Sequence, residues 1–320
     1  MSDKKIVLQF IALTFVIAYA TSGILIVLGH FGYRVYGLVH SFRQFATNIP
    51  FAIYILSPAI ASYVILKNNK KISGVQEWLK TVFCIKSKSF VYFAIFAVLV
   101  LYFGINIAVS GHVGMALPFY MFFLSLPGNL FIGGLEEAGW TYVLQPRMDQ
   151  KYGFLLSSVL VGIIWIFWHV PLFFIPGTAH CEGTIDFWMF NVQVISLSFF
   201  RGAIYRIGKD FLPISPAIPR VTHGKAVRCP LTVGCPHVCP SKLAHPCGRP
   251  PGLSHKISEK GYVFPFMLFH TMFNSTSSLF GSTTMTWSGT ITANTAMILI
   301  SILIVSVYGR TQRLKMWLKK

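Results

Sequence analysis

Long apolar stretches recur along the whole chain and are separated by shorter polar segments. Each has about the 20 residues that an α-helix needs to cross the hydrocarbon core of a bilayer. The pattern predicts spans at roughly 6–28, 48–66, 89–109, 117–145, 154–175, 185–206, 262–280 and 293–309. The predicted fold class is therefore all-α, a polytopic transmembrane helical bundle of about eight spans.

Composition and charge agree with this prediction. Hydrophobic residues make up 54% of the 320 positions, charged residues only 11%, and the mean hydropathy is +0.62. A soluble domain carries about 25% charged residues. The first span is also too long for the apolar region of a signal peptide, so we expect it to remain as a helix.

The net charge of +18 is explained by its distribution along the chain. If the N-terminus is cytoplasmic, all of the 27 Lys and Arg except Arg34 and Arg43 fall on the cytoplasmic side. This asymmetry follows the positive-inside rule. It predicts a multi-pass protein of the cell membrane with both termini in the cytoplasm. No separate basic surface suggests a nucleic acid as partner, so the expected environment is the lipid bilayer.

Residues 209–256 interrupt the apolar pattern. This stretch holds nine of the 17 Pro and four of the six Cys, with one Phe and no Trp or Tyr. Such a composition cannot bury enough apolar surface to form a core, which predicts a disordered cytoplasmic insert. A zinc site is the alternative, but the spacing lacks the two close Cys pairs of structural zinc sites. Its ligands would come from Cys229, Cys235, Cys239, Cys247 and the nearby histidines.

A few ionisable residues lie within predicted spans. They are Glu136, Glu137, His169 and His270. A charged side chain at the centre of a membrane helix costs about 2.5–3.5 kcal/mol, so such residues usually have a function. Asn274 lies one helical turn after His270 and shares its face. These side chains are the candidate catalytic residues of a polar cavity.

Three motifs make the family resemblance specific. Glu136 and Glu137 begin the run EEAGWT, Trp165 precedes His169 by four residues, and His270 precedes Asn274 by four. The chain thereby resembles the CPBP (Abi) proteins, relatives of the type II CAAX prenyl endopeptidases. Their pattern is EExxxR, then an aromatic residue four before His, then HxxxN or HxxxD. The resemblance covers roughly residues 117–280 without the insert.

The resemblance implies hydrolysis of a peptide bond inside the membrane. Glu136 and His169 would activate a water, His270 and Asn274 would stabilise the oxyanion, and Glu137 would orient active-site groups. The implied substrate is a hydrophobic or lipidated peptide, in CAAX-type processing, peptide maturation or bacteriocin self-immunity. No cofactor is predicted. A divalent metal such as zinc is the alternative, because two histidines and a glutamate are a potential ligand set, although no HExxH is present.

The resemblance also divides the chain. Residues 1–116 would form N-terminal transmembrane helices, and residues 117–280 a catalytic core interrupted by the insert 209–256. Residues 281–320 would form a C-terminal helix and a basic tail.

One position departs from the family pattern. Thr141 stands where the pattern has Arg, and Arg147 is the nearest basic residue that could substitute for it. Thr141 can donate a hydrogen bond to Glu137 but cannot neutralise it. The departure favours a second hypothesis, a catalytically impaired protein that binds or sequesters a peptide. A third hypothesis is a small transporter with Glu137 and His169 in a proton relay, but the sequence shows no inverted repeat.

Overall fold

The computed structural model describes residues 3–37, 39–111, 114–208, 262–280 and 286–317. Every element within these ranges is helical, which confirms the predicted fold class. The insert 209–256, with its potential zinc ligands, lies outside the described residues. The α-helices are α1 (Asp3–Gly29), α2 (Phe42–Ile55), α3 (Ser57–Asn68), α4 (Val75–Val82), α5 (Ser89–Ser110), α6 (Tyr120–Phe131), α7 (Glu137–Gly139), α8 (Gln145–His169), α9 (Phe187–Gly208), α10 (Val263–Phe280) and α11 (Trp287–Trp317); the other helical elements are η1 (Gly134–Glu136, 3₁₀), η2 (Trp140–Leu144, π) and η3 (Val170–Phe173, 3₁₀).

The structure supports a multi-pass membrane protein with fewer clear spans than predicted. Among the described residues, five helical stretches are long and apolar enough to cross a membrane. A sixth is counted if α2 and α3, which meet at a bend of 53°, form one span. The count of about eight is therefore not confirmed. Two predicted spans fall within one stretch, Tyr120–Phe173, and α10 carries polar side chains that lower its hydropathy.

The helix boundaries between residues 117 and 175 also differ from the prediction. The predicted span 117–145 ends just before Pro146, but the chain stays helical there, because η2 runs directly into α8 and Pro146 lies in the first turn of α8. Proline is tolerated in the first turn of an α-helix. The actual breaks occur at Gly133 (φ 117°) and Gly153 (φ 72°). Glycine adopts positive φ without the steric penalty of other residues, which explains why the chain bends at these positions.

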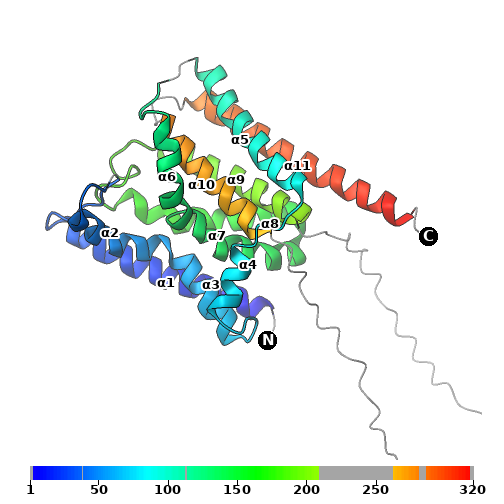
Figure 1. Cartoon of the computed structure of the whole chain (residues 1–320), viewed down its shortest axis with the longest axis horizontal. Helices are drawn as coiled ribbons and strands as arrows, with labels where there is room; N and C mark the ends of the chain where they lie inside the picture. Colours follow the sequence, from blue (N-terminus) through cyan, green and yellow to red (C-terminus); the bar gives the residue numbers. More distant parts are fainter. Residues whose placement is uncertain (1–2, 38, 112–113, 209–261, 281–285, 318–320) are drawn as a thin grey trace, which may run out of the picture.

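The helices form three groups, as Figure 1 shows. Helices α1 to α3 lie on one side, α5 and α11 lie on the other, and α6 to α10 lie between them. Helix α9 packs closely against α8 because small residues line the contact. A Cβ atom added to Gly162 would lie 2.8 Å from Ile195 Cδ1, and one added to Gly202 would lie 2.8 Å from Ser158 Oγ. Close approach through small residues is a common way of packing helices in membranes.

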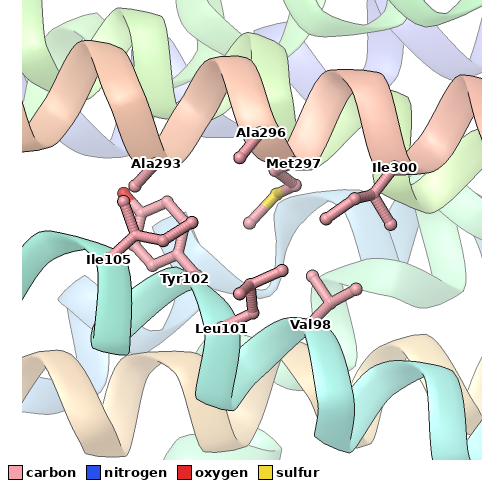
Figure 2. A pocket seen from close by; sticks show the side chains of 8 residues that line it. All are labelled: Val98, Leu101, Tyr102, Ile105, Ala293, Ala296, Met297 and Ile300. Atoms are coloured by element: carbon pink, nitrogen blue, oxygen red, sulfur yellow. The ribbon is translucent and has the colours of Figure 1, made fainter.

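The outer pair α5 and α11 encloses a small apolar pocket, shown in Figure 2. The space between these side chains of the two helices is too small for a water molecule. Its only polar group is the hydroxyl of Tyr102, so we interpret it as a packing gap rather than a catalytic site. The lining residues are Val98, Leu101, Tyr102 and Ile105 of α5 and Ala293, Ala296, Met297 and Ile300 of α11.

Candidate active site

The two glutamates follow a sharp break in the helix. Helix α6 ends at Phe131, and the chain turns at Gly133 before η1 and α7 begin. A Cβ atom added to Gly134 would lie 2.6 Å from Thr271 Oγ1 and 3.3 Å from the carbonyl oxygen of Met267. Helix α10 therefore packs directly on this turn. The close approach brings the carboxylates to the helix that carries His270.

Glu137 is the most heavily bonded residue of the site. Its Oε2 accepts hydrogen bonds from Arg201 Nε at 2.9 Å and from Thr141 Oγ1 at 2.6 Å. Its Oε1 accepts from Arg201 Nη2 at 3.0 Å and lies 3.0 Å from His270 Nδ1. The side chains of Glu137 and Arg201 are both 0% exposed. They form a buried bidentate ion pair, the geometry in which Arg binds a carboxylate most strongly.

Glu136 is held from one side only. Its Oε2 accepts hydrogen bonds from two indole groups, Trp140 Nε1 at 2.9 Å and Trp165 Nε1 at 3.0 Å. The other oxygen, Oε1, lies 3.6 Å from His270 Nε2. This distance exceeds that of a direct N–H···O hydrogen bond. Oε1 is therefore the oxygen of Glu136 that is left for chemistry.

His270 stands between the two carboxylates. An ionised carboxylate only accepts hydrogen bonds, so the contact with Glu137 requires a proton on His270 Nδ1. In the neutral ring, Nε2 is then an acceptor that faces Glu136. Glu137 thus fixes both the orientation and the tautomer of the imidazole.

His169 joins the site through ring contacts. Its Nδ1 lies 2.8 Å from the carbonyl oxygen of Trp165, one turn earlier on α8. The Trp165 ring lies 5.2 Å from the ring of His169 and 5.6 Å from that of His270, between centroids. Trp165 therefore contacts both histidines and Glu136. His169 and Glu136, which were predicted to activate a water together, are each in contact with Trp165.

Asn274 lies at the edge of the site, half-buried on α10. Its Nδ2 would be 2.8 Å from a Cβ atom added to Gly133. The side chain therefore lies against the turn that precedes the two glutamates. The structure places all five predicted residues in one region, with Glu136, Glu137 and His270 in direct polar proximity.

Arg201 was missed by the sequence reasoning. The positive-inside count assigned it to the cytoplasmic side, yet the side chain is 0% exposed on α9. The available signal was its position inside the predicted span 185–206, where a charge requires an explanation. Arg147 does not substitute for the family Arg. It lies 3.4 Å from Asp3 and donates to the carbonyl oxygen of Val143.

The described residues do not fit a metal site. No three His, Cys, Asp or Glu side chains within the described ranges come together at metal-binding distance. Both oxygens of Glu137 already accept hydrogen bonds from Arg201, and Oε2 of Glu136 accepts two more. The atoms left, Glu136 Oε1 and His270 Nε2, are two potential ligands, fewer than a zinc site uses.

Apolar side chains of α8, α9 and α10 pack around His270, and the gap that they line has no room for a water molecule. His270 therefore borders a dry, tightly packed part of the core. The lining residues are Trp165, Leu197, Phe266, Phe269, His270 and Phe273.

Comparison with known proteins agrees with the motifs. Residues 116–215 match the family described as type II CAAX prenyl endopeptidase Rce1-like. Over 72 residues the chain is 31% identical to CAAX prenyl protease 2 from Methanococcus maripaludis. That alignment covers 22% of this chain and 24% of the relative, so the chain spans about a quarter of the length of the protein it matches. Residues 116–215, which carry the first two motifs, are therefore similar to the CAAX endopeptidases, in agreement with the resemblance that the motifs predicted.

Proposed function

We propose that this protein is an intramembrane endopeptidase of the CAAX-processing type, with a water that bonds to both Glu136 and His270. The 3.6 Å separation of Glu136 Oε1 and His270 Nε2 is the observation that carries the proposal. At this separation the two atoms do not bond each other directly, and a water that lies beside the pair can reach both. Each group is also held in place by hydrogen bonds on its other side. Glu136 accepts from two indoles, and His270 bonds to Glu137.

The proposed water donates one O–H group to Glu136 and the other to His270, which leaves a lone pair for the scissile carbonyl carbon. The carbon–oxygen bond forms as Glu136 takes a proton. That proton passes from Glu136 to the amide nitrogen when the carbon–nitrogen bond breaks, which yields a carboxylic acid and an amine. We assign Asn274 to the developing oxyanion and keep His169 as the predicted partner of Glu136 in activating the water.

Two observations support a hydrophobic or lipidated peptide as the substrate. The side chains that pack around His270 are almost entirely apolar. The relative from Methanococcus maripaludis carries the name CAAX prenyl protease 2. CAAX processing is therefore the first reaction to test, followed by peptide maturation and bacteriocin self-immunity.

The test is cleavage of a peptide library by the full chain in reconstituted membranes. The library contains farnesylated and unmodified peptides of the same sequences. We expect Glu136→Gln to lower the cleavage rate by about 10²- to 10⁴-fold, the usual contribution of a general base. Glu182→Gln is the matched control, because Glu182 is an exposed residue that pairs with Arg34. It should keep the wild-type rate, and a chelator should leave that rate unchanged.

The alternative of a catalytically impaired binder makes the opposite prediction. A binder would retain peptides without cleaving them, and Glu136→Gln would leave that retention unchanged. The observation that first favoured it was the missing Arg at position 141. The ion pair of Arg201 with Glu137 weakens this argument, because the buried carboxylate has a partner after all.

A further inference from the structure

We infer that Arg201 is a positioning residue that supplies, from α9, the charge that the family pattern places at position 141. The inference builds on the proposed function but rests on its own geometry. Among the described residues, both hydrogen bonds of Arg201 go to Glu137, and Nη1 has no partner. The polar contacts of this guanidinium are therefore directed at one carboxylate.

The guanidinium also touches the residue that holds the other glutamate. Its central carbon lies 4.0 Å from the centre of the Trp165 ring and 5.1 Å from that of Phe266. Trp165 in turn donates its indole N–H to Glu136. Arg201 thus contacts Glu137 by an ion pair and the Glu136 side of the site by a cation–π contact.

The ion pair has a consequence for His270. With Arg201 in place, Glu137 is a charge-compensated acceptor for the His270 Nδ1 proton. Without Arg201, Glu137 would be an uncompensated charge in an apolar interior, a state that proteins avoid by neutralising the group. A neutral carboxyl group no longer requires the proton on Nδ1. The imidazole would then lose the constraint that directs Nε2 towards Glu136.

The side chains of Thr141 and Arg201 bond to the same carboxylate oxygen. Thr141 Oγ1 and Arg201 Nε both donate to Oε2 of Glu137. A guanidinium that started from position 141 would therefore reach the same carboxylate. We therefore predict that an arginine at position 141 can replace Arg201 of α9 as the partner of Glu137 and preserve the arrangement of the site.

The test compares wild type, Arg201→Ala, the relocation variant Thr141→Arg/Arg201→Ala, and Arg206→Ala as matched control. Arg206 lies on the same helix and pairs with a different buried carboxylate, Asp149. Nitrogen-15 NMR of labelled histidine in detergent micelles reports the tautomer of His270, assigned by comparison with His270→Gln. Peptide cleavage is measured in parallel, with kcat and KM determined separately. Arg201→Lys is a second variant in case the alanine variant does not fold.

We expect Arg201→Ala to shift the His270 signal and to lower kcat by about 100-fold, the scale of a misplaced catalytic group. Arg201→Lys should shift the signal less, because lysine keeps the positive charge but cannot donate the two parallel hydrogen bonds of the guanidinium. The relocation variant should restore both the signal and most of kcat, and Arg206→Ala should leave the signal unchanged. An unchanged His270 signal after loss of Arg201, or failure of the relocation to restore it, overturns the inference. A wild type without peptidase activity would refute the proposed function, while the His270 signal would still decide the role of Arg201.

Discussion

At the scale of single residues, two indole groups decide which oxygen of Glu136 is left for chemistry. Trp165→Phe keeps the ring but removes the N–H that bonds Oε2. A hydrogen bond to a charged group contributes about 1.5–3 kcal/mol. If this interaction positions Glu136 in the transition state, its loss should lower kcat by about 10- to 100-fold. Cleavage kinetics of the purified variant in reconstituted membranes measure this effect.

A matched control is Trp168→Phe. Trp168 is also buried, but its Nε1 donates to Ser57 Oγ at 2.9 Å instead of a glutamate. Both variants should lose thermal stability in detergent, since each leaves a buried acceptor with one donor fewer. Only Trp165→Phe should lose activity to this extent. Equal kinetic losses in the two variants would show that general loosening of the site, rather than the bond to Glu136, is responsible.

The two glutamates and two histidines could be identified as candidates from the sequence, because the spacing of a motif can be read without knowledge of the fold. Glu136, Glu137 and His270 form one network, as an internal polar cavity would require. Arg201 could not be found in the same way. Its partner lies 64 positions away, and only the packing of the central helices reveals that the two side chains meet. The positive-inside count treated Arg201 as a topological signal, although it compensates a buried charge.

At the scale of elements, the turn after α6 places the candidate base. Gly133 has φ of 117°, and a Cβ atom there would meet Asn274 Nδ2 at 2.8 Å. Gly133→Ala should therefore lower the free energy of unfolding by about 1–3 kcal/mol, the usual cost of such strain. Gly128→Ala is the control within the same stretch, because an added Cβ atom there meets nothing within 4 Å. Thermal unfolding in detergent and peptide cleavage should both distinguish the two variants, and equal behaviour would contradict this account of the turn.

Hydropathy predicted most helices but not this turn. Residues 117–145 are apolar enough to look like one span, since glycine does not interrupt an apolar average. The structure instead ends α6 at Phe131 and starts a new helical course at Gly134. Positive φ and close contact with α10 are three-dimensional causes. Their only trace in the sequence is the pair Gly133–Gly134 just before the glutamates.

At the scale of the whole molecule, the two ends of the chain that flank the insert lie next to each other. Helix α9 ends at Gly208 and the described chain resumes at Tyr262. A Cβ atom added to Gly208 would lie 3.1 Å from Tyr262 Cβ, so the two residues are in contact. The rings of Tyr205 and Tyr262 also pack at a centroid distance of 5.2 Å. The fold therefore needs only a short connection between α9 and α10, such as residues 257–261 could provide.

Deleting residues 209–256 should accordingly leave the bundle and the site intact. If the insert is the flexible loop that its composition predicts, closing a loop of about 5 residues in place of about 50 saves roughly 2 kcal/mol of entropy. The unfolding temperature in detergent should stay the same or rise, and the peptide cleavage rate should stay within about twofold. A variant with residues 209–256 in scrambled order is the control for length. If deletion abolishes membrane insertion while the scrambled chain inserts normally, the connection acts through its length. If both variants fail and the wild type alone retains bound zinc by mass spectrometry, the cysteines of the insert form a structural site, and the prediction of a dispensable insert is wrong.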